Sequence, residues 1–83
     1  MRDRASSSTY LKNLGQAIRA VREQRGASQE SLGFDSELDR TYISGVERGV
    51  RNPTIASLLR IAKALGTTPA KLLQHAEHVA RRS

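Results

Sequence analysis

The chain contains no cysteine and no tryptophan, and its 83 residues include a single phenylalanine. Without cysteine, neither a disulfide framework nor a thiolate metal site can form. No apolar run is long enough to span a bilayer or to form the core of a signal peptide. With so few aromatic residues, the core has to be built from Leu, Ile, Val and Ala. These absences favour one small cytoplasmic domain with an aliphatic core.

Alternating β-branched segments of the kind that form strands are also missing, whereas apolar residues recur at three- and four-residue spacing. The sequence therefore predicts an all-α fold, with a flexible arm over residues 1–7, a domain over residues 8–80 and a frayed tail over residues 81–83. Five helices are expected. The first is capped by Ser8 or Thr9 and stops at Gly26; the second spans Gln29–Ser36; the third runs from Asp39 or Arg40 to Arg48. The fourth lies between a Thr54 cap and Gly66, and the fifth begins with a Thr68 cap and Pro69.

Each expected helix carries apolar residues on one side, which we assign to the core. Leu38 is expected to fill the turn between the second and third helices. Phe34 is either a core residue or a partly exposed ring, and the core is favoured. The other inward residues are expected to be Tyr10, Leu11, Leu14, Ala17, Ile18, Val21, Leu32, Ile43, Val46, Ile55, Leu58, Leu59, Ile61, Ala62, Leu65, Leu72, Leu73, Ala76 and Val79 or Ala80.

The net charge is +6, from 14 Lys and Arg against 8 Asp and Glu, and the pI is about 10.8. Eleven of the cations are Arg, which binds phosphate and guanine in a bidentate manner. This balance points to a polyanionic partner, with nucleic acid as the leading candidate. A membrane surface is less favoured, because no helix combines a Lys-rich face with a bulky aromatic face.

The stretch from Ser28 to Arg48 can be divided into two short helices joined by a sharp turn. Ser28 is positioned to cap the first helix and Asp39 the second. In the second helix, Ile43 and Val46 fall on one side at 100° per residue. The opposite side carries residues that suit phosphates and base edges, namely Arg40, Thr41, Ser44, Gly45 and Arg48.

Two charged residues border apolar stripes and are expected to pair. Arg22 lies at the edge of the first helix's stripe, and Glu47 lies near the docked side of the third helix. A charge at such an edge needs a partner when it is buried. The alternative, two unrelated surface charges, is less favoured.

Three segments together resemble a known family. They are L-G-Q-A-I-R-A-V-R-E-Q-R-G-A-S-Q-E-S-L, L-D-R-T-Y-I-S-G-V-E-R-G-V-R-N-P-T and S-L-L-R-I-A-K-A-L-G-T-T-P-A-K-L-L. In order and spacing they resemble the lambda-repressor-like helix-turn-helix family (XRE, or Cro/C1-type) from about Tyr10 to Leu73. R-T-Y-I-S-G-V-E-R-G followed by R-N-P is especially similar to the controller proteins of restriction-modification systems.

This resemblance implies a helix-turn-helix regulator that binds double-stranded DNA as a homodimer through its C-terminal helices, with the helix from Arg40 in the major groove. It also implies that the pairing of Arg22 with Glu47 is a structural ion pair. Bases would be contacted by Arg40, Thr41, Ser44 and Tyr42, and phosphates by Ser28, Gln29, Arg48, Arg51, Asn52 and Thr54.

Two positions depart from the family pattern. Gly33 stands where the family usually has Ala, which lowers helix propensity by about 1 kcal/mol but preserves close packing. Glu37 stands where Gly usually forms a left-handed turn, and a non-Gly residue there is strained by roughly 1 kcal/mol. We therefore expect the fold to hold but the turn to be open to reshaping.

Other chemistry finds little support in the sequence. His75 and His78 lie three residues apart, but no further ligand is within sequence reach, so no metal or other cofactor is expected. The serines at 6–8 lack any nucleophile motif, so catalysis is not expected. The alternative functions are an antitoxin or another module that binds a protein partner and DNA secondarily, and a non-specific nucleic-acid binder.

Overall fold

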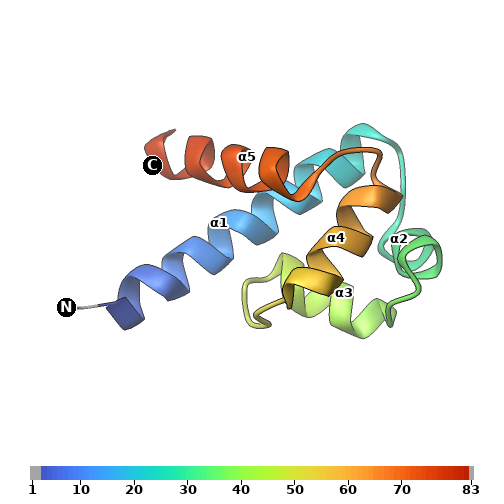
Figure 1. Cartoon of the computed structure of the whole chain (residues 1–83), viewed down its shortest axis with the longest axis horizontal. Helices are drawn as coiled ribbons and strands as arrows, with labels where there is room; N and C mark the ends of the chain where they lie inside the picture. The colour runs from blue at the N-terminus through green and yellow to red at the C-terminus, as the bar shows by residue number, and fades with distance from the viewer. Residues whose placement is uncertain (1–2, 83) are drawn as a thin grey trace.

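The structure is a computed structural model that describes the backbone of residues 3–82 and the side chains of residues 7–81. Within these residues the chain is all-α, as the sequence predicts. The molecule measures 38 × 21 × 18 Å, and α1 and α5 pack along one another at one side of it (Figure 1). The helices are α1 (Asp3–Gln24), α2 (Gln29–Ser36), α3 (Arg40–Glu47), α4 (Ile55–Ala64) and α5 (Pro69–Arg82).

The predicted start of the first helix is wrong. α1 begins at Asp3, so the stretch up to Ser7 that we expected in a flexible arm is helical. Ser8 and Thr9 suggested a cap because their hydroxyls can bond the backbone, but such residues are also tolerated inside an exposed helix. At the other end, α5 continues past residue 80 to Arg82. Residues 1, 2 and 83 lie outside the part described.

The core is aliphatic, as the composition predicts. α1 contributes the longest apolar stripe. α3 and α5 pack against α1, and α4 packs against α2 and α5. Tyr10, Val21, Leu38 and Leu73 pack against this core while partly exposed. The buried apolar residues are Leu14, Ala17, Ile18, Leu32, Ile43, Val46, Leu58, Ile61, Ala62, Leu65, Leu72 and Ala76.

Three apolar residues that we assigned to the core are exposed instead. The Phe34 side chain is 84% exposed, because α2 is only two turns long and is buried through Leu32 on another side. In α4, Ile55 is 78% and Leu59 is 48% exposed. They lie four positions apart, so they form a strip of their own beside the buried face of the helix.

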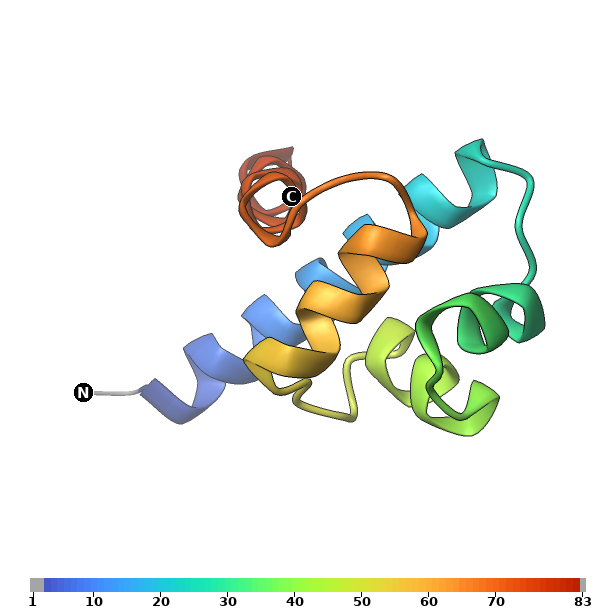
Figure 2. The ribbon, with the colours of Figure 1, turned by 45° about the vertical axis from the view of Figure 1, so that its right-hand side comes forward.

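Gly15 allows α1 to pass directly over the end of α3. A Cβ atom at this position would collide with the backbone carbonyl oxygens of Val46 and Glu47. The two helices therefore meet backbone to backbone, without an intervening side chain. This contact fixes the C-terminal end of α3, which lies with the following loop on the opposite side of the molecule from α5 (Figures 1 and 2).

Candidate nucleic-acid interface

The predicted caps define the starts of α2 and α3. The Ser28 hydroxyl accepts a hydrogen bond from the Ser31 N–H at 3.0 Å, and the Ser31 hydroxyl accepts one from the Ser28 N–H at 3.0 Å. The Asp39 carboxylate accepts one from the Thr41 N–H at 3.2 Å. Each cap satisfies a backbone donor that the first turn of a helix leaves unpaired.

The turn between α2 and α3 keeps its left-handed residue although that residue is not glycine. Glu37 has φ 60° and ψ 37°, and the Leu38 N–H donates to the Gly33 carbonyl at 2.9 Å. Gly33 is needed here, because a Cβ would lie 2.8 Å from the Leu38 carbonyl oxygen. The turn is therefore not reshaped, and the strain expected at Glu37 is retained.

α3 has one buried and one outward side. Ile43 and Val46 are buried, whereas Arg40, Thr41 and Arg48 are exposed and Ser44 is half-buried. Gly45 departs from the prediction: it is buried, because the Arg51 side chain lies across it. The outward surface of α3 and its C-cap residue Arg48 thus hold two guanidinium groups and two hydroxyls, all able to form hydrogen bonds with nucleic acid.

Hydrogen bonds prearrange the hydroxyls on this surface. The Thr41 hydroxyl donates to the Asp39 carboxylate at 3.1 Å, and Arg48 Nε donates to the Ser44 hydroxyl at 3.4 Å. Because the Thr41 proton is directed at Asp39, its oxygen lone pairs remain available as acceptors. Thr41 is therefore suited to accept from a base amino group.

Arg22 and Glu47 form a buried ion pair below α3. Arg22 Nε donates to Glu47 Oε2 at 2.7 Å, Nη2 donates to Oε1 at 3.0 Å, and Nη1 donates to the Ala27 carbonyl at 2.9 Å. The hydrogen bond with Glu47 raises the pKa of Arg22 above its ordinary value, against the opposing effect of desolvation. This pair joins the end of α1 to α3.

Gln29 joins the same network. Its Nε2 donates to Glu47 Oε1 at 3.0 Å, and the side chain is half-buried. The family resemblance implies a phosphate contact for this residue, and no pattern in the sequence indicated the internal bond. One Nε2 proton is used in this way, and the other proton remains available to an outside acceptor.

The loop after α3 carries the remaining predicted phosphate contacts. Arg51 and Asn52 are exposed. The Thr54 hydroxyl accepts from the Ser57 N–H at 3.0 Å and so caps α4. Arg51 also places its Cζ 5.4 Å from the centre of the Tyr42 ring, a contact that no periodic pattern in the sequence could reveal.

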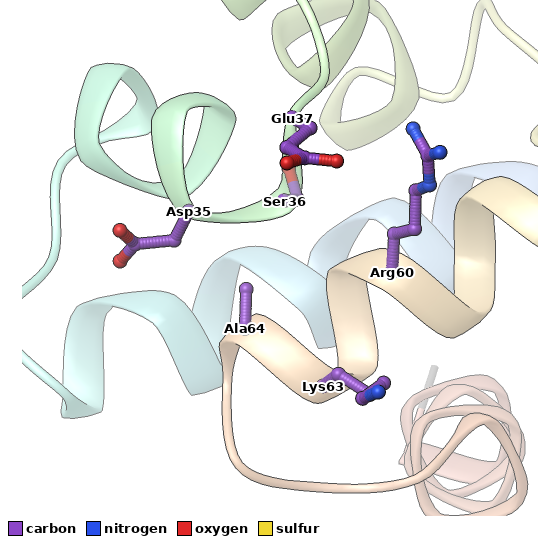
Figure 3. Close-up of a pocket in the computed structure, with 6 residues that line it drawn as sticks. All are labelled: Asp35, Ser36, Glu37, Arg60, Lys63 and Ala64. Carbon is purple, nitrogen blue, oxygen red and sulfur yellow. The ribbon is translucent and has the colours of Figure 1, made fainter.

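A concavity lies between the end of α2 and α4 (Figure 3). Its volume is about 360 Å³, and it is lined by Asp35, Ser36, Glu37, Arg60, Lys63 and Ala64. Carboxylates and cations therefore share its walls. Unlike the outward side of α3, it presents neither charge sign consistently.

Within the described part of the chain, no cluster of three or more His, Asp or Glu side chains is placed to hold a metal ion. None of the helices described is long and apolar enough to cross a membrane.

Two short capped helices, a tight turn and an outward polar side on the second helix define a helix-turn-helix protein. The helix-turn-helix family profile matches residues 18–72. The chain is 47% identical over 60 residues to control protein C.BamHI of Bacillus amyloliquefaciens, covering 71% of this chain and 74% of that protein.

Solved structures agree with the sequence matches. The restriction-modification controller protein C.AhdI of Aeromonas hydrophila superposes with a TM-score of 0.74 at 47% identity, over 75% of this chain and 94% of that chain. The controller protein C.Esp1396I was solved as a tetramer in complex with its natural 35 base-pair operator. It superposes with a TM-score of 0.76 at 38% identity, over 84% of this chain and 92% of that chain. The chain belongs to the helix-turn-helix family, among its XRE-type regulators.

Proposed function

We propose that this protein is a sequence-specific regulator of transcription that binds double-stranded DNA as a homodimer, as a restriction-modification controller does. One observation carries the proposal: the outward surface of α3 presents Arg40, Thr41, Ser44 and Arg48 from a helix that buried Ile43 and Val46 hold in place. Such a helix fits the major groove. The protein acts by binding and not by catalysis, and its place of action is the nucleoid in the cytoplasm.

Arg40, Thr41, Ser44 and Tyr42 are the proposed base-contacting residues. Arg40 can fork onto guanine, and Thr41 and Ser44 can bond base edges. Solved variants of C.Esp1396I replace an arginine, a threonine and a tyrosine that are consecutive in that protein. The same three residue types stand in the same order at positions 40–42 of this chain, which supports the assignment.

The proposed phosphate contacts surround α3. The starts of α2 and α4, at Ser28 and Thr54, offer unpaired backbone N–H groups and the positive end of a helix dipole. These contacts fix the position of the protein on the duplex without reading its sequence. The side chains that act with these helix starts are Gln29, Arg48, Arg51 and Asn52.

The dimer surface is proposed to lie on the C-terminal helices, with α4 supplying its exposed apolar part. Leu72 and Ala76 of α5 are used in the core, whereas Ile55 and Leu59 of α4 face outward. Two α3 helices related by a two-fold axis would enter successive major grooves about 34 Å apart. The operator is then a pseudo-palindrome with half-sites about 10 base pairs apart.

Selection from a randomised pool of DNA duplexes tests the proposal. It is done at physiological salt with excess non-specific competitor. The expected result is enrichment of a two-fold-symmetric site with half-sites one helical turn apart. A matched variant in which Arg40, Thr41 and Ser44 are all replaced by Ala should fold, because none of the three is buried, yet enrich nothing. Binding that fades with salt and has no preferred sequence would refute the proposal.

A further inference from the structure

The loop residue Arg51 is docked on α3 at Gly45. A Cβ at Gly45 would lie 2.6 Å from Arg51 Cγ and 3.5 Å from its Cβ. The Arg51 N–H also donates to the Gly45 carbonyl at 3.2 Å. Both the backbone and the aliphatic stem of this arginine therefore rest against the helix, in space that exists because position 45 has no side chain.

The guanidinium of Arg51 continues from this stem onto Tyr42. Its Cζ lies 5.4 Å from the ring centre, inside the roughly 6 Å reach of a cation–π contact. Tyr42 is half-buried and packs against the core, whereas Arg51 is exposed. Tyr42 and Gly45 are three residues apart and share one side of α3. The ring is thus the fixed element, and the cation lies on its outer face.

We propose that Tyr42 and Gly45 are positioning residues that aim the Arg51 guanidinium at the DNA backbone. This inference rests on the proposed function. In this role the face of the Tyr42 ring holds the guanidinium of the loop residue Arg51 in place, in addition to any contact that the Tyr42 hydroxyl makes. It also makes Arg51 part of the same rigid recognition unit as α3.

The competing view is that Arg51 acts as a freely moving positive charge near the phosphates. The two views differ in what can replace each residue. If Arg51 is a free charge, replacing it with Lys leaves DNA affinity unchanged, and the residue at position 42 does not affect its contribution. A stacked guanidinium needs both its planar fork and the ring beneath it.

Substitutions at position 42 separate the ring from the hydroxyl. Tyr42→Phe keeps the ring and removes the hydroxyl, whereas Tyr42→Leu removes both. In the free protein, the Arg51 side-chain protons should show ring-current shifts in wild type and Tyr42→Phe, and these shifts should disappear in Tyr42→Leu. This NMR measurement needs no DNA, so it tests the geometry independently of the proposed function.

DNA affinity, measured as a function of salt on the selected operator, tests the consequence. Arg51→Ala should lower affinity several-fold and reduce the salt slope by about one. Tyr42→Leu should reduce the slope further than Tyr42→Phe does. In a protein that also carries Arg51→Ala, Tyr42→Leu and Tyr42→Phe should bind almost equally well, because the effects of coupled residues are not additive.

Gly45→Ala offers a second route that leaves the ring intact. Ala raises helix propensity, and its Cβ displaces the Arg51 stem. In Gly45→Ala we expect the melting temperature to be preserved while the DNA affinity falls toward that of Arg51→Ala. The DNA affinity of Arg51→Lys should also fall toward that of Arg51→Ala.

Three results would overturn the inference. The first is that the Arg51 ring-current shifts are unchanged in Tyr42→Leu. The second is that Tyr42→Phe and Tyr42→Leu differ in DNA affinity by the same factor with and without Arg51→Ala, and the third is that Arg51→Lys keeps full DNA affinity. A wild-type protein that selects no operator would instead remove the proposed function, and the inference with it.

Discussion

Arg22 and Glu47 stand 25 positions apart in the chain, yet two parallel hydrogen bonds of 2.7 and 3.0 Å join their side chains below α3. Both residues are buried, so neither charge can be left alone without a large desolvation penalty. The pair therefore ties the orientation of α3 to the integrity of the fold.

Glu47→Gln should destabilise the protein by about 3–5 kcal/mol, because it leaves the buried Arg22 cation without a counter-charge. Urea denaturation measures the loss. Glu23→Gln is the matched control: it breaks the exposed Arg19–Glu23 pair, whose atoms are 3.1 Å apart, and should cost about 0–0.5 kcal/mol. Equal effects of the two changes would contradict the role assigned to the buried pair.

Glu37→Gly should stabilise the protein by up to about 1 kcal/mol, because glycine adopts the left-handed conformation of this turn without strain. Thermal unfolding provides the measurement. Glu37→Ala removes the same carboxylate and keeps a Cβ, so it separates charge from backbone strain. If Ala stabilises as much as Gly, the effect comes from the charge.

Arg40→Ala should lower affinity for the operator by about 1–3 kcal/mol and relax the preference at one base pair. Binding to the operator and to single-base variants is measured by titration. Arg60→Ala removes an equal charge from an exposed position on α4, at the concavity of Figure 3, and should leave the preference intact. Equal losses on operator and random DNA for Arg40→Ala would disprove its base contact.

Leu59→Glu should weaken the dimer, because it places a charge in the apolar strip of α4 that we propose faces the second copy. Sedimentation across a concentration series measures the dissociation constant. Phe34→Glu changes a residue that is more exposed but lies on α2, and it should leave dimerisation unchanged. A dimer that tolerates Leu59→Glu but not Phe34→Glu would place the interface elsewhere.

The stability of the α1–α5 contact should fall at alkaline pH. Burial, and then the nearby Glu77 carboxylate, raise the pKa of Tyr10 above its ordinary value of 10.0. The folded state thus holds the phenol proton more tightly than the unfolded state does. Its stabilising contribution is complete below pH 10 and is lost as pH rises through the raised pKa.

Urea denaturation between pH 8 and pH 11 checks this. Tyr10→Phe, which has no titrating group, should show a smaller decline than wild type. Identical pH profiles would contradict the linkage. A steeper decline in Tyr10→Phe than in wild type would mean that ionisation of Tyr10 stabilises the folded protein, which is the opposite of the expected direction.

Local signals made α2 and α3 predictable, because a capping residue marks the start of each helix and the pair Ile43 and Val46 marks the buried side of α3. The ion pair was also accessible, since helical geometry places both charges beside apolar stripes. Phe34 was placed wrongly because the two turns of α2 give too few residues for their spacing to identify the buried side. The start of α1 was missed because capping and helix-interior serines look alike in sequence.

The contact of Arg51 with Tyr42 and Gly45 lay beyond the sequence for a different reason. Loop residues follow no period, so their side chains cannot be assigned to a face. The internal bond of Gln29 was hidden in the same way, because its amide could equally reach out or in. The apolar strip of α4 could not be told from the core, since both are leucine and isoleucine at helical spacing.

The hydrogen bond from Gln29 to Glu47 has a consequence for the thermodynamics of binding. The carboxylate of Glu47, in α3, accepts hydrogen bonds from Arg22 of α1 and Gln29 of α2, so three helices meet at one carboxylate. The groups that would touch DNA are then held in register before the duplex arrives. Little conformational entropy remains to be lost on association, and more of the contact energy appears as affinity.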